Sequence, residues 1–179
     1  EYHVDGFHLI GGNLPIGSIV HDPLLSRTKI FTDTFHGEYD DRRKYKNLFI
    51  YKEEYQFPVR MLLNHYDTDI KDFANQQKKQ DVNYGFVNFV ASNNGFTLAD
   101  LFAYNEKHNE ANGEDNKDGS EYNLSFNFGI EGASKKRFVN DIRRKRIRLA
   151  YQMMFYAQGV PMIMSGDEFG NTQAGNNNA

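Results

Sequence analysis

Short apolar runs bounded by polar turns recur along the 179-residue chain, and runs of this kind predict β-strands. The run at 86–91 (FVNFVA) has little polarity between its β-forming residues, which is typical of a strand that is covered on both faces. Four more strands are expected, at residues 1–9, 28–35, 48–51 and 160–165.

Helical periodicity is clearest over residues 134–158, between a capping Ser134 and a terminating Gly159. The pattern predicts a buried face made of Phe138, Ile142, Leu149, Met153 and Tyr156. It also predicts that four arginines face solvent or pair with acids, namely Arg143, Arg144, Arg146 and Arg148.

Three shorter helices are also expected. One is residues 59–63, with Pro58 in its first turn. Residues 67–80 are expected to form a second helix, which is weakly amphipathic. Residues 98–104 are expected to form a third helix that Thr97 can cap. This alternation of strands and helices argues for an α/β protein with parallel strands, in which polar loops follow the carboxyl ends of the strands.

Two polar segments are candidates for chemistry. Asn93 and Asn94 follow the buried strand, where α/β proteins keep their sites, although two asparagines are also ordinary in a turn. Residues 105–123 have the composition of a disordered linker, yet a long structureless loop inside a compact domain is uncommon and often functional.

Composition excludes several classes of function. A net charge of -3 argues against nucleic acid and anionic membrane as partners, despite the arginine-rich run in 143–148. No apolar run reaches the roughly 18 residues of a membrane-spanning helix. The absence of cysteine excludes disulfides and thiolate catalysis. The chain starts at Glu1 without a methionine, so secretion stays open.

No metal and no cofactor is predicted. The histidines lack the spacing of a zinc site. Residues 114–119 have only a weak likeness to a calcium loop, because Ser125 stands where that loop needs a bidentate glutamate.

Four segments resemble the α-amylase superfamily (glycoside hydrolase family 13), specifically its glycogen debranching and isoamylase branch. They are YHVDGF at 2–7, DPLLSRTKI at 22–30, the stretch 88–114 that contains NEKHNEANGE, and GDEFGNTQAGNNNA at 166–179. The resemblance implies a (β/α)8 TIM barrel with its active site at the carboxyl ends of the strands. Residues 1–179 would be a fragment of it: the C-terminal half of the barrel, strands four to eight with their helices.

The resemblance also places the catalytic positions, and each is altered. Retaining glycosidases use two carboxyl groups about 5–5.5 Å apart, one as nucleophile and one as acid/base. Ile10 stands at the family's nucleophile position and His8 at that of a supporting arginine. Asp33 replaces the acid/base glutamate. The family's histidine–aspartate pair after strand seven is Asn93-Asn94, so the stabilising charge at Asn94 is lost.

The resulting hypothesis is a debranching glycoside hydrolase, specific for α-1,6 bonds, whose active site is degenerate. The resemblance implies an α-glucan ligand such as glycogen or a starch-type oligosaccharide, and it favours the cytoplasm. The implied substrate-binding residues are His8, Asn93, His108, Asn109 and Asp167.

Two alternatives stay open: a non-catalytic α-glucan-binding or regulatory partner, or an enzyme whose chemistry is rerouted to an acid such as Asp5 or Asp167. A lone half-barrel would expose sheet edges and apolar surface, so self-association or dependence on an N-terminal half is expected.

Overall fold

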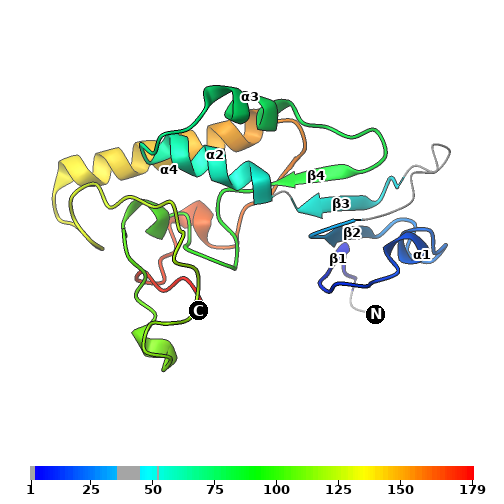
Figure 1. Ribbon diagram of the computed structural model, residues 1–179, viewed down its shortest axis with the longest axis horizontal. Helices are drawn as coiled ribbons and strands as arrows, with labels where there is room; N and C mark the ends of the chain where they lie inside the picture. The colour runs from blue at the N-terminus through cyan, green and yellow to red at the C-terminus, as the bar shows by residue number, and fades with distance from the viewer. Residues whose placement is uncertain (1–2, 36–44, 52) are drawn as a thin grey trace.

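The computed structural model describes residues 3–35, 45–51 and 53–179, and it contains one five-stranded parallel sheet (Figure 1). The strands are β1 (Gly6–Leu9), β2 (Lys29–Thr32), β3 (Leu48–Tyr51), β4 (Gly85–Asn88) and β5 (Val160–Pro161). Each strand pairs with the next one in the sequence, in the order β1-β2-β3-β4-β5. The prediction of an α/β protein with parallel strands is confirmed.

The strands are mostly shorter than the apolar runs that predict them, although β3 has the predicted bounds. Strand β1 has four residues where nine were expected, of which residues 1–2 lie outside the described ranges, and β5 has two residues where six were expected. Beyond Pro161, the Met162 N–H donates to the Asn88 carbonyl at 2.9 Å, and the pairing with β4 ends there. Pro161 itself has no N–H group, which is tolerated in a strand at the edge of the sheet. The side chain of Asn88 donates to the Gln158 carbonyl at 2.6 Å and ties β4 to the approach to β5.

Helix α1 (Ile16–Val20) precedes β2, and helix α2 (Glu53–Leu63) follows β3. The prediction for α2 was wrong at its start, because Pro58 lies inside the helix instead of in its first turn. Proline at this position removes only the one backbone hydrogen bond that its N–H would have made. Helix α3 (Ile70–Lys78) is capped by the side chain of Asp69, which accepts from the Lys71 N–H at 2.8 Å.

The predicted helix at 98–104 is wrong in type, because only Asp100–Phe102 is helical and it forms a 3₁₀ turn, η1. Thr97 does cap this turn, since its Oγ1 accepts from the Asp100 N–H at 3.1 Å. An α-helix cannot continue because other backbone donors occupy the carbonyls. The N–H groups of Phe126 and Gly132 bind the carbonyls of Leu101 and Ala103 at 3.1 and 2.7 Å.

Helix α4 (Arg137–Tyr156) confirms the long predicted helix, but its predicted buried face is correct only in part. Leu149 and Met153 are partly buried against the larger apolar cluster. Phe138 and Tyr156 are 74% and 84% exposed. The buried residues of α4 are instead Val139, Arg143, Ala150 and Met154. The face is therefore rotated by about one residue, and it carries an arginine into the interior.

Helices α2, α3 and α4 lie together on one side of β4, and α1 lies near β2 at the other end of the sheet (Figure 1). The larger apolar cluster joins α2, the segment after β4 and α4; its fully buried members include Tyr55, Phe96, Leu101 and Phe102. A smaller cluster around Ile30 and Leu48 supports β2 and β3. Within the described ranges, no helix combines the length and hydrophobicity needed to cross a bilayer.

Candidate active site at the carboxyl edge of the sheet

Because the strands are parallel, the residues that follow them meet at one edge. We call the side chains His8, Ile10, Asp33, Tyr51, Asn93 and Asn94 the carboxyl edge. His8 Nε2 and Asp33 Oδ1 lie 2.9 Å apart, so two of the residues singled out in the sequence are in contact. Register explains this, because His8 pairs with Phe31 and places its ring beside the end of β2.

Tyr51 completes this part of the edge, and sequence reasoning missed it. Its ring stacks on His8 with 4.3 Å between centroids and 14° between planes. Burial and the charge of Asp33 raise the pKa of Tyr51, so its hydroxyl stays protonated at neutral pH. A cavity of about 480 Å3 opens beside Asp33 and Tyr51. A stacked aromatic pair next to a carboxylate is suited to binding a sugar ring, which has apolar faces and polar edges.

The other two positions that the resemblance predicts to be catalytic carry no acid. Ile10 directly follows β1, and its hydrocarbon side chain is 73% exposed. Asn93 and Asn94 are exposed in the turn after β4, where Ser92 Oγ accepts from the Asn94 N–H at 3.3 Å. An isoleucine has no atom that can attack a sugar, and an amide has no charge to stabilise a cationic transition state.

A buried arginine lies beneath the asparagine turn. Arg60 of α2 donates from Nε to the Val90 carbonyl at 2.8 Å and from Nη1 to the Asn123 carbonyl at 3.1 Å. Burial lowers its pKa to about 10, so it keeps its charge at neutral pH. Nη2 has no partner among the described residues and would lie 3.9 Å from a Cβ at Gly95. Arg60 thus joins α2, the turn after β4 and the long polar loop.

The long polar loop is ordered, and it binds the segment that contains Asn176 and Asn177. We call residues 100–133 and 172–178 the loop cluster. Asn109 is completely buried: its amide donates to Asn177 Oδ1 at 2.8 Å, and its Oδ1 accepts from the Asn177 N–H at 2.9 Å. Asp100, 1% exposed, accepts from the N–H of Gln173 at 2.8 Å and from the hydroxyl of Thr172.

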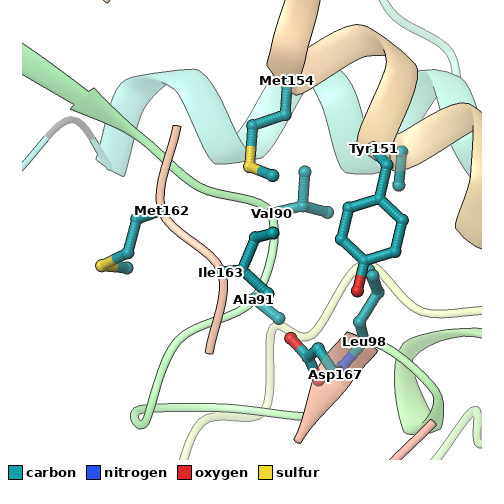
Figure 2. Close-up of a pocket in the computed structure, with 9 residues that line it drawn as sticks. Val90, Ala91, Leu98, Tyr151, Met154, Met162, Ile163 and Asp167 are labelled. Atoms are coloured by element: carbon teal, nitrogen blue, oxygen red, sulfur yellow. Dashed lines mark hydrogen bonds between the residues drawn. The ribbon is translucent and has the colours of Figure 1, made fainter. Parts of the chain in front are cut away.

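The remaining substrate-binding residues of the prediction lie away from the open edge. His108 belongs to the loop cluster, in which its backbone N–H donates to the Gly175 carbonyl at 2.7 Å. Asp167 is 5% exposed and accepts from the Leu98 N–H at 2.9 Å. Burial raises the pKa of Asp167. Figure 2 shows its carboxylate beside Leu98 and Ala91, in a cavity of about 10 Å3 that has room for one water at most.

No group of three histidine, aspartate or glutamate side chains in the described ranges is placed to hold a metal ion. The loop at 114–119 therefore forms no such cluster. Asp115 and Asn116 adopt positive φ angles of 52° and 58°, and Asn116 Oδ1 accepts from the Asn109 N–H at 2.8 Å. The polar groups of this loop are used to fold the loop itself.

Comparisons with known proteins agree with this geometry. A glycogen debranching enzyme of Erwinia tasmaniensis is 34% identical over 202 residues, an alignment that covers 100% of this chain and 31% of the enzyme. The chain is homologous to glycogen debranching enzymes and isoamylases. Isoamylase 1 of Oryza sativa, a chloroplastic protein, is 49% identical over 92 residues, and a GlgX homologue of Mycobacterium tuberculosis is 50% identical over the same length.

These last two alignments cover 51% of this chain and 12% and 13% of the relatives. The chain thus spans about a third or less of the length of the relatives that it matches. No family model matches it. The resemblance to the debranching and isoamylase branch of the α-amylase family is confirmed.

Proposed function

We propose that residues 1–179 are strands four to eight of a (β/α)8 barrel, the C-terminal half of a debranching-type catalytic domain. The sheet supports this, because consecutive parallel strands lie side by side in sequence order. A barrel segment has this order, whereas doubly wound sheets reverse their strand order at a switch point. The homology to debranching enzymes supports the same assignment.

We further propose that this domain has lost hydrolysis and keeps α-glucan binding. The observation that carries this is the carboxyl edge itself: an exposed Ile10 at the nucleophile position beside an Asp33 carboxylate that is bound to His8. Loss of a catalytic nucleophile lowers the rate of other hydrolases by about 10⁴–10⁶-fold. The shorter Asp33 and the neutral Asn94 lower it further, because the acid is misplaced and the transition state loses a charge.

Binding is supported by the groups that remain at the edge. The stacked rings of His8 and Tyr51 offer an apolar platform, and the exposed amides of Asn93 and Asn94 offer hydrogen bonds. The names of the relatives point to glycogen, so a branched α-glucan is the proposed ligand. A binding or regulatory partner of an active enzyme would use the same surface.

The test measures cleavage and binding on the full-length protein, because residues 1–179 are proposed to be only half of the barrel. The purified protein is expected to release no reducing ends from pullulan or glycogen, while maltooligosaccharide binds saturably in calorimetry. The triple variant Ile10→Asp, Asp33→Glu and Asn94→Asp is expected to gain α-1,6 cleavage, because it restores the three acids. A matched triple of exposed residues outside the edge, Ile70→Asp, Asp115→Glu and Asn178→Asp, should gain none. Wild-type cleavage at ordinary enzyme rates would refute lost hydrolysis, and absence of glucan binding would refute the retained site.

A further inference from the structure

A second cavity, of about 350 Å3, lies between α4 and the segments that follow α2 and Leu124. Its lining residues are His65, Phe128, Ile142, Lys145, Arg146 and Leu149. Pockets for small molecules commonly have volumes of about 300–1,000 Å3 and mostly apolar walls. This groove meets both conditions, and it shares no residue with the carboxyl edge.

Two cations at this groove lack a counter-charge. Arg146 Nη2 lies 2.6 Å from His65 Nε2, and its guanidinium lies 5.9 Å from the centre of the Phe128 ring. Among the described residues, neither Lys145 nor Arg146 forms an ion pair with a carboxylate. Two other arginines of α4, Arg137 and Arg144, do form ion pairs, and both pair with Asp141. No acid lines the groove, so an anion that enters it meets positive charge alone.

The two aromatic walls are held on an unfavourable backbone. His65 and Phe128 have φ angles of 64° and 55°, in the left-handed region that bulky residues rarely adopt. Strain of this kind costs about 1–3 kcal/mol per residue and concentrates where a ligand is held. Both rings border the same cavity, although Leu124 and Ala174 adopt the same backbone conformation outside the groove.

We propose that this groove binds a small amphipathic anion: a carboxylate or phosphate monoester head on an apolar body. The anionic head pairs with Lys145 and Arg146, and the Arg146 side chain gives up its contact with His65 to bind it. The apolar body lies against Ile142, Leu149 and the Phe128 ring. Such a site gives the protein a ligand unrelated to glucan, and the proposal does not depend on the state of the carboxyl edge.

Calorimetry with octanoate and octyl phosphate tests this on the 179-residue protein. Both are expected to bind saturably, and comparison of the two identifies the preferred head. Arg146→Gln and Lys145→Gln should each weaken binding about tenfold, the value of one charge-assisted hydrogen bond. Arg148→Gln, an exposed arginine of α4 outside the groove, is the matched control and should leave affinity unchanged.

Two further ligands separate the head from the tail. 1-Octanol has the same tail and no charge, and inorganic phosphate has the charge and no tail; each should bind at least tenfold more weakly. Equal binding of either one would overturn the proposal. Ile142→Ser should weaken octanoate binding while thermal melting stays close to that of wild type, because Ile142 is not part of the main apolar cluster. Unchanged affinity in the Lys145, Arg146 and Ile142 variants would also overturn it.

Discussion

The carboxyl edge and the loop cluster lie in one small protein, yet they are built in opposite ways. At the carboxyl edge, the side chains of Ile10, Asn93 and Asn94 are exposed. Among the described residues, the Asp33 carboxylate has a side-chain hydrogen bond with His8 alone. In the loop cluster, buried polar side chains bind one another and the backbone through many hydrogen bonds. Substitution at the edge changes chemistry at little cost to stability, whereas a buried network is costly to disturb. Under the proposed function, this difference would allow catalytic acids to be replaced at the edge while the surrounding scaffold persists.

Arginines of α4 give the largest expected effect. Arg143 donates to the carbonyls of Gly132 at 2.6 Å and Asn127 at 2.8 Å, and to that of Ile130. Arg143→Met should lower the free energy of unfolding by about 3 kcal/mol, because buried carbonyls lose their donors. Arg144→Met, which breaks only an exposed pair, should change it by less than about 0.5 kcal/mol. Urea unfolding measures both, and equal effects would show that the buried hydrogen bonds from Arg143 to the loop cluster stabilise the protein no more than an exposed ion pair does.

The same chemical change can be made in both regions. Asp100→Asn should cost about 2 kcal/mol, because the new amide cannot accept from both the Thr172 hydroxyl and the Gln173 N–H. Asp33→Asn should cost about 0.5 kcal/mol or less, since its carboxylate is half exposed. Thermal melting of the two variants under identical conditions gives the comparison. A larger loss in Asp33→Asn would reverse it.

Lowering the pH is expected to have the smallest effect, confined to the hydrogen bonds around Asp118 in the loop cluster. Hydrogen bonds from Asn112 and Asn178 lower the pKa of Asp118. A lowered carboxyl pKa gives stability that is present above the ordinary value and is lost as the pH falls through the folded value. Asp118 should therefore release these amides only as the pH falls below the ordinary pKa of an aspartate, seen as lower protection from amide hydrogen exchange in the loop cluster. Asp118→Asn should remove this dependence, and Asp167, whose pKa is raised by burial, should act with the opposite sign.

Much of the fold was predictable because strands and helices repeat their apolar residues regularly. The order of elements, the bounds of β3 and the existence of α4 follow from that repeat. The buried face of α4 does not, because periodicity counts arginine as polar. The Arg143 guanidinium carries several donors in one plane, and a ring of carbonyls in the interior can accept them.

The candidate site was predictable only in part, because the sequence pattern does not show which side chains of neighbouring strands touch. Strand ends located Asp33 and the asparagine turn, but contacts such as His8 with Tyr51 depend on strand register and on which face each ring takes. By its composition, the loop at 105–123 would be called disordered, because composition measures only how much apolar surface a segment can bury. Asparagine side chains both donate and accept, so Asn109 and Asn177 fold the loop by satisfying each other.

The bond between Asn109 and Asn177 has a further consequence, for the order in which the molecule forms. Its two residues are 68 positions apart, so a ribosome delivers the long polar loop well before the segment that holds it. Contacts of such separation form late, because the intervening chain must first be ordered. The loop cluster is therefore expected to become rigid only after the C-terminal segment has been made, so the long polar loop stays accessible in a nascent chain until then.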